Sequence, residues 1–121
     1  MISGIDLNET VDYSCKDDKK DPTIWKLGLL PSFVLARIMT RAKQEQTEAL
    51  YEMVSIGLKG WSNFKSKGKD VEYRTEKQNL YGQPIDALPK ELINMIPFPV
   101  VVELSTELMQ VNQLTDEERK N

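Results

Sequence analysis

Apolar and polar positions alternate near the start of the chain. Every second residue is apolar between positions 11 and 15: Val11, Tyr13 and Cys15. Beyond the polar loop 16–22 the alternation returns in TIWKLGLL (23–30), with apolar residues at Trp25, Leu27 and Leu29. A period of two residues is typical of strands that bury one face. The pattern therefore predicts a β-hairpin within residues 1–30.

The middle of the chain changes to helical spacing. Between Phe33 and Asn63 there is no proline, and apolar residues recur every three or four positions as far as Gly57 and Trp61. This period predicts amphipathic helix over residues 32–63, with Ser32 as the N-cap. The polar patch KQEQTE (43–48) interrupts the apolar stripe. The region therefore forms either one long helix or a pair of helices.

Residues 64–84 are expected to form a loop with one short strand. The stretch DVEYRT (70–75) alternates between polar residues and Val71, Tyr73 and Thr75. It follows Gly68, which can adopt the positive φ that a turn requires. From residue 85 to 121 helical spacing returns, which predicts two to three short helices.

The C-terminal helices have candidate boundaries. Asp86 is placed to cap the first helix, PFP (97–99) ends it, and Pro99 suits the first turn of the next. The run VVV (100–102) alone suits a strand equally well. A capping box, TDEE (115–118), opens a last helix.

These segments predict one domain over residues 1–121 with an α+β, mainly α-helical fold. Its expected order is an N-terminal β-hairpin (1–30), a long amphipathic helix or helix pair (32–63), a loop with a short strand (64–84), and two to three short C-terminal helices (85–121). A chain of 121 residues suits a single modest hydrophobic core.

The composition narrows the chemistry that the chain can carry. It has no histidine and a single cysteine, which removes the commonest general base, cysteine-rich zinc sites and an intrachain disulfide. A net charge of −3 provides no overall positive field for nucleic acid. No segment has the pattern of a signal peptide or a membrane span. We therefore expect a cytoplasmic protein that is not an enzyme, has no cofactor or metal, and binds neither nucleic acid nor membrane.

One stretch, GLKGWSNFKSKGKDVEY (57–73), combines glycines, lysines and aromatic residues. Such a combination can hold phosphate or stack bases. Gly57, however, is in phase with the apolar stripe of the preceding helix. Acidic residues follow the lysines at once and cancel the local positive field: Asp70, Glu72 and Glu76. The spacing favours a structural corner, in which Trp61 ends the helix and a lysine-rich turn leads into a strand.

The C-terminal region carries an apolar stripe with two interpretations. Its members recur at helical spacing: Val101, Leu104, Leu108, Val111 and Leu114. They form either part of the core or a surface that binds a partner helix. In the second case the predicted partner contacts are Leu104, Leu108, Val111 and Leu114.

Five stretches of the chain also follow one another in a characteristic order. They are DPTIWKLGLL (21–30), GLKGWSNF (57–64), GKDVEY (68–73), IDALPKELINMI (85–96) and VVVELSTELMQVNQLTDEERKN (100–121). A Gly-x-x-x-Trp-x-Asn-like run, a Leu-Pro-x-x-Leu helix and an acidic end recur in this way in one family. Over residues 21–121 the chain resembles the tail assembly chaperones of tailed bacteriophages.

The resemblance implies a non-enzymatic role in virion assembly. Such chaperones bind the tape-measure protein, keep it soluble and recruit tail-tube subunits in the host cytoplasm. Self-association into a homo-oligomer stays open. The alternative is a phage virion structural protein, such as a connector, tube or decoration subunit, which would be located in the virion. A small regulator of a host protein is a third class.

Overall fold

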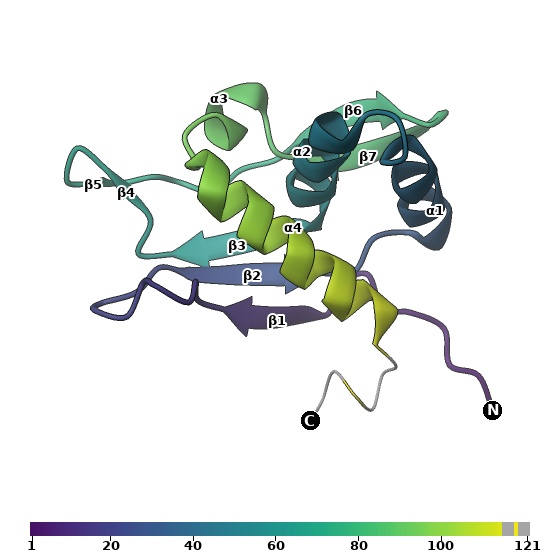
Figure 1. Ribbon diagram of the computed structural model, residues 1–121, viewed down its shortest axis with the longest axis horizontal. Helices are drawn as coiled ribbons and strands as arrows, with labels where there is room; N and C mark the ends of the chain where they lie inside the picture. Colours follow the sequence, from purple (N-terminus) through teal and green to yellow (C-terminus); the bar gives the residue numbers. More distant parts are fainter. Residues whose placement is uncertain (115–117, 119–121) are drawn as a thin grey trace.

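The computed structural model describes residues 1–114 and residue 118. About 37% of these residues are helical and 24% lie in strands, so the fold is α+β with a substantial β component. The expectation of a mainly α-helical protein is therefore wrong. The described residues form three antiparallel sheets beside four helices (Figure 1). The β content was underestimated because several strands lie where a helix or a loop was expected.

The largest sheet has three antiparallel strands in the order β1-β2-β3. Their bounds are β1 (Thr10–Tyr13), β2 (Ile24–Gly28) and β3 (Leu58–Ser62). Tyr13 pairs with Trp25, and Trp25 pairs in turn with Trp61, so β2 is the central strand. The β-hairpin predicted within residues 1–30 is confirmed. Trp25 and Leu27 are buried on its inner face, as the alternation predicts.

The region 32–63 contains a pair of helices and a strand. A turn at residues 42–45 separates α1 (Ser32–Arg41) from α2 (Gln46–Gly57), so the helix-pair interpretation is confirmed. The prediction that the helix continues as far as Asn63 is wrong, because the chain forms β3 after Gly57. Trp61 pairs there with Trp25, and the two rings meet edge to face with centroids 6.0 Å apart. Ser32 is the first residue of α1, and Pro31 takes the cap position.

Two hairpins follow where one short strand was predicted. They pair β4 (Lys65–Ser66) with β5 (Lys69–Asp70), and β6 (Glu76–Leu80) with β7 (Gln83–Ala87). Each turn contains two residues with positive φ, the second being Gly68 or Gly82, as a type I′ turn requires. The strand predicted across 70–75 is wrong beyond Asp70. Asp86 lies in β7, so the C-terminal helices begin after residue 87 instead of at 85.

Two helices complete the described chain, α3 (Lys90–Ile93) and α4 (Phe98–Gln113). The run VVV (100–102) is helical, and Pro99 lies in the first turn as predicted. With 16 residues α4 is not a short helix, which corrects the expected length. It crosses one face of the main sheet and packs beside α2 (Figure 1). The capping box predicted from Thr115 lies outside the described residues.

The hydrophobic core is centred where α4 packs on α2 and β2. Gly57 permits the close approach, because a Cβ atom at this position would lie 2.6 Å from Cδ2 of the buried Leu108. Asn112 ties the end of α4 to the sheet. Its side chain accepts a hydrogen bond from the N–H of Leu30 (2.9 Å) and donates one to the carbonyl of Gly28 (3.3 Å). Packing thus holds the middle of α4, and hydrogen bonds hold its C-terminal end.

A polar contact ties α4 to β1. The hydroxyl of Tyr13 donates a short hydrogen bond to the carboxylate of Glu103, which also accepts one from the N–H of Lys16 at 2.9 Å. The bond from Tyr13 is the main cause that lowers the pKa of Glu103. Burial, followed by this carboxylate, raises the pKa of Tyr13. The contact is therefore strongest when Glu103 is ionised and Tyr13 is neutral.

Gly57→Ala is expected to lower the free energy of unfolding by about 1–3 kcal/mol, the range for overpacking a core. The added methyl group would collide with Leu108. Gly4→Ala is the matched control, because nothing lies within 4 Å of the Cβ position at Gly4. Urea unfolding measures the difference. Equal stability of Gly57→Ala and the wild type would contradict the close packing of α2 on α4.

Glu103→Gln should remove part of the acid sensitivity of folding. Because the folded-state pKa of Glu103 is lowered, its contribution is present above the ordinary carboxyl pKa and is lost as the pH falls through the folded-state value. At neutral pH the variant should be less stable than the wild type by about 1 kcal/mol. The gap should shrink near pH ~3. Urea midpoints at the two pH values test this, and a gap that does not change with pH would argue against the Tyr13 contact.

Candidate functional site

A cavity of about 310 Å³ lies between α1, α2 and α4. All three helices contribute to its largely apolar lining, which includes Met39 from α1, Leu50 and Met53 from α2, and Thr106 and Met109 from α4. Concave apolar surfaces between helices are frequent binding sites for small ligands and for helices of a partner. Its shape and lining make this cavity the candidate binding site.

Toward its N-terminus α4 also exposes apolar side chains that lie outside the lining of this cavity. Phe98 is 51% exposed and Val102 is 36% exposed. With Thr106 and Met109 they recur at intervals of four, four and three residues, so they lie on one side of the helix. The ring of Phe98 also stacks on Tyr51 of α2, with centroids 6.3 Å apart. We call this combined surface the apolar groove; its members include Met39, Leu50, Met53, Phe98, Val102, Thr106 and Met109.

The groove exists because α4 is apolar on two sides. Its inner side enters the core through Val101, Leu104, Leu108 and Val111. A surface helix usually carries charged or polar residues opposite its buried side. In α4 the side with Phe98 and Val102 is apolar instead, and it is exposed. Contiguous apolar surface that the fold leaves uncovered is typical of an interaction site.

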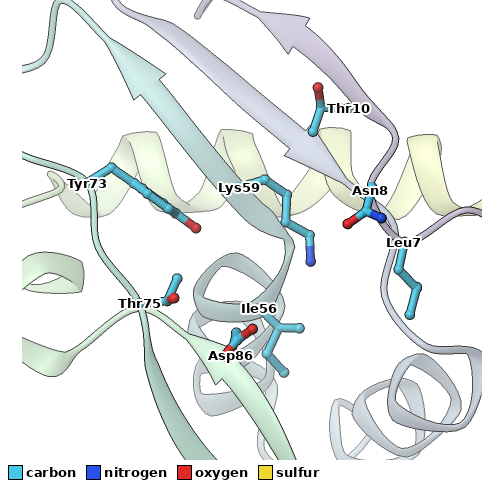
Figure 2. A pocket seen from close by; sticks show the side chains of 8 residues that line it. All are labelled: Leu7, Asn8, Thr10, Ile56, Lys59, Tyr73, Thr75 and Asp86. Atoms are coloured by element: carbon cyan, nitrogen blue, oxygen red, sulfur yellow. The ribbon is translucent and has the colours of Figure 1, made fainter.

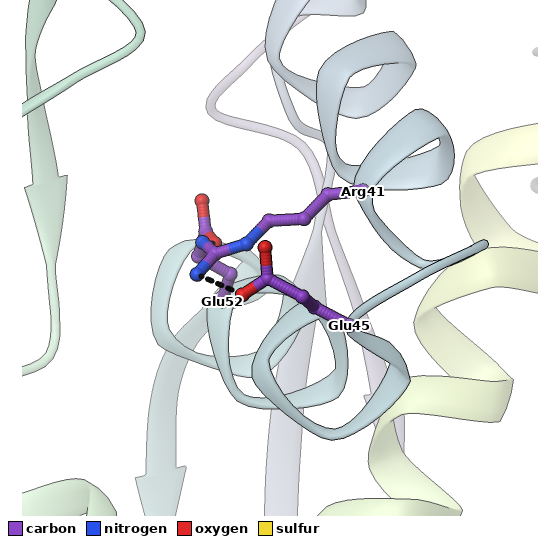
Figure 3. A network of polar contacts seen from close by, with 3 residues as sticks. All are labelled: Arg41, Glu45 and Glu52. Atoms are coloured by element: carbon purple, nitrogen blue, oxygen red, sulfur yellow. Dashed lines mark hydrogen bonds and ion pairs between the residues drawn. The ribbon is translucent and has the colours of Figure 1, made fainter.

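Charge pairing fixes two of the helices that form the groove. The guanidinium of Arg41, at the end of α1, pairs with Glu45 (3.3 Å) in the turn and with Glu52 in α2 (Figure 3). The hydroxyl of Tyr81 is buried near these groups; burial, and then the Glu52 carboxylate, raise the pKa of Tyr81. The relative position of α1 and α2, and hence the width of the groove, depends on these ion pairs as well as on packing.

The four residues predicted as partner contacts lie elsewhere. Leu104 and Leu108 are fully buried, and Val111 is 7% exposed. Leu114 is half-buried just after the end of α4. A partner could reach Leu104 or Leu108 only if α4 left the sheet, so we place no partner surface there. The burial of this stripe supports the interpretation that it belongs to the core rather than to a partner-binding surface.

The residues of the groove were missed in the sequence, although one signal was present. Phe98, Val102 and Met109 form a second stripe at helical spacing, displaced from the inner stripe. From spacing alone either stripe can face the core. Met39 carries no such signal, because its 42% exposure depends on how α1 packs on its neighbours.

The lysine- and aromatic-rich stretch 57–73 is largely occupied by its own contacts. Rings from this stretch and β2 pack together with centroid distances from 5.0 to 6.0 Å: Trp25, Trp61, Phe64 and Tyr73. The indole N–H of Trp61 donates to the carbonyl of Val71 at 2.7 Å. Rings engaged in this cluster offer little free face for stacking on bases. The stretch is a structural corner. Its first part forms the strand β3, although the sequence predicted the end of a helix at Trp61.

Cys15 does not have the environment of a reactive thiol. Burial, and then the carboxylate of Glu103, raise the pKa of its thiol to about 11. A thiol with so high a pKa is almost fully protonated at neutral pH and is a weak nucleophile. Among residues 1–114 and 118 no cluster of histidine, cysteine, aspartate or glutamate is arranged as a metal site. Within the same residues, no helix combines the length and apolar character needed to cross a membrane.

Comparison with protein-family models, with curated proteins and with solved structures finds no match for this chain. The resemblance to phage tail assembly chaperones therefore rests on the five sequence stretches alone and stays a prediction. The structure contributes the apolar groove as the candidate binding surface.

Proposed function

We propose that this protein is a non-enzymatic assembly chaperone that binds an amphipathic helix of its partner in the apolar groove. The partner that agrees with the sequence resemblance is a phage tape-measure protein, held soluble in the host cytoplasm while tail-tube subunits are recruited. The observation that carries the proposal is the uncovered apolar side of α4, together with the cavity that it forms with α1 and α2.

The dimensions of the groove suit a helix. From Phe98 to Met109 its length along α4 is about 16 Å at a rise of 1.5 Å per residue, which corresponds to three helical turns. A partner helix lying in the groove would present apolar residues at positions i, i+3 or i+4, and i+7. The aromatic ring of Phe98 at one end is the type of side chain that anchors such interfaces.

The lining of the groove suits a partner with variable helical faces. It includes three methionines, Met39, Met53 and Met109, whose unbranched side chains adapt to irregular surfaces. Proteins that bind many related helices commonly use methionine-rich surfaces for this reason. A long tape-measure protein would present a series of different apolar faces to successive copies of the chaperone. The net charge of −3 per copy would keep neighbouring complexes apart in solution.

Met39→Asp should weaken binding to the tape-measure protein at least about tenfold, because a carboxylate would enter the apolar contact. Met95→Asp is the matched control: Met95 is 40% exposed, nearly the same as Met39, but it lies outside the lining of the groove cavity. Coexpression of tagged tape-measure protein with each variant measures the soluble complex, and thermal unfolding checks that both variants fold. A wild-type protein that gives no complex and no gain in soluble tape-measure protein would refute the chaperone role.

Mass spectrometry of purified virions distinguishes the assembly chaperone from the alternative, a structural protein of the virion. An assembly chaperone should be absent from the particles, or present far below the stoichiometry of tail-tube protein. A stoichiometric amount in the particles would instead favour a connector, tube or decoration subunit.

A further inference from the structure

A second cavity, of about 380 Å³, lies between the N-terminal segment, β3 and the β6–β7 hairpin (Figure 2). It shares no lining residue with the cavity of the apolar groove. The side chain of Lys59 extends from β3 into it, and Asn8, Tyr73, Thr75 and Asp86 lie around it (Figure 2). Unlike the groove, this cavity has a lining that is about half polar, with a lysine among its side chains.

The position of Lys59 depends on a glycine in the neighbouring strand. A Cβ atom at Gly28 would lie 2.5 Å from Cγ of Lys59 and 2.8 Å from its Cε. The aliphatic part of the lysine therefore lies flat on Gly28, in space that any other side chain would fill. This packing holds the half-buried side chain in place and presents its ammonium group to the cavity.

The ammonium group of Lys59 has no direct partner in the described chain. Within the described chain it makes no ion pair and no side-chain hydrogen bond. Asp86 also lines the cavity, but its carboxylate is paired with Lys77 at 3.0 Å. Lys59 and the Asp86–Lys77 pair together leave one positive charge, although Lys77 itself lies outside the lining of the cavity. Burial is the main cause that lowers the pKa of Lys59, and the carboxylate of Asp86 opposes this shift only in part.

Neutral hydrogen-bond donors lie close to this charge. The side-chain amide of Asn8 and the hydroxyl of Thr75 line the cavity. In Figure 2 the side chains of Asn8 and Tyr73 point toward Lys59 from opposite sides. The hydroxyl of Tyr73 donates its proton to the carbonyl of Leu58 at 2.6 Å, so it offers only its oxygen to the cavity. A ligand in the cavity would therefore meet one cation, the carboxylate of Asp86, and neutral donors that include Asn8 and Thr75.

We propose that this cavity binds a small carboxylate monoanion, with Lys59 as its counter-ion and Asn8 and Thr75 as hydrogen-bond donors. Two carboxylate oxygens can accept hydrogen bonds from the ammonium group and from a neutral donor at once. A single negative charge matches the single excess positive charge. A phosphate dianion would be disfavoured, because it would face the carboxylate of Asp86 with a second charge that nothing compensates.

The test is a titration of the full-length protein with sodium acetate, followed through the backbone amide resonances by NMR. Amides near Asn8, Lys59 and Thr75 should shift and saturate at millimolar acetate. Sodium chloride at the same ionic strength should not reproduce the shifts, and inorganic phosphate should bind more weakly than acetate. Shifts that never saturate, or that chloride reproduces, would overturn the proposal.

Two lysine variants test the role of the ammonium group. Lys59→Met keeps an unbranched chain over Gly28 and should weaken acetate binding at least tenfold. Lys69→Met, at an exposed lysine outside the cavity, should leave the affinity unchanged. If Lys59→Met binds acetate as well as the wild type, the assignment is wrong.

Asp86→Asn provides a test that does not depend on loss of binding. Removing the carboxylate from the cavity lining should tighten acetate binding several-fold, because it removes a repulsive charge. A decrease in affinity in a folded Asp86→Asn protein would mean that the carboxylate does not oppose the anion, and would count against the proposal even if Lys59→Met failed to fold.

Discussion

The fold depends on the close contact between the end of α2 and the middle of α4. Gly57 is the last residue of α2, and the absence of a side chain there lets Leu108 pack against the helix backbone. The chain then enters β3 without a loop, so the residue that permits the close approach of α4 directly precedes the third strand of the main sheet. A larger residue would collide with the side chains of Leu108 and Leu30, at the place where α4 packs on both α2 and β2. Asn112 reinforces this position from the C-terminal end, where its side chain hydrogen-bonds to the backbone of the last residue of β2 and of Leu30 just beyond it.

This arrangement uses one side of α4 for the core and leaves another apolar side uncovered. The inner leucines, Leu104 and Leu108, are removed from water, whereas Phe98 and Val102 remain accessible. The groove that results has walls of different kinds: α4 is fixed by packing, and the α1–α2 pair is also fixed by the ion pairs of Arg41. A helix bound there would be covered on two sides by apolar surface that already has its shape, which reduces the entropy lost on binding. The Lys59 cavity has a different lining and different chemistry, so the two surfaces are expected to act independently.

The sequence predicted the N-terminal hairpin from its period of two and α4 from its helical period. The polar patch at 43–48 left open whether the chain forms one helix or two there, and the turn between α1 and α2 decides for two. β3 was misread because Leu58 and Trp61 continue the helical spacing of α2; what decides its structure is pairing with Trp25, which is distant in sequence. The strand β6 has polar residues on both faces, so no alternation reveals it. For the site, the sequence identified α4 as an apolar helix, but spacing alone does not determine which of its two stripes faces the core. That depends on tertiary packing at Gly57.

The central proposal is that the apolar groove binds a helix of the partner. Methyl NMR of the methionines tests it most directly, since Met39, Met53 and Met109 line the groove while Met95 is exposed outside its cavity. A peptide that carries one amphipathic helix of the tape-measure protein would be added to protein with ¹³C-labelled methionine methyl groups. The account predicts saturable shifts of Met39 and Met109, with Met95 unchanged. Shifts confined to Met95, or no shift of Met39 and Met109 when the peptide binds, would contradict it.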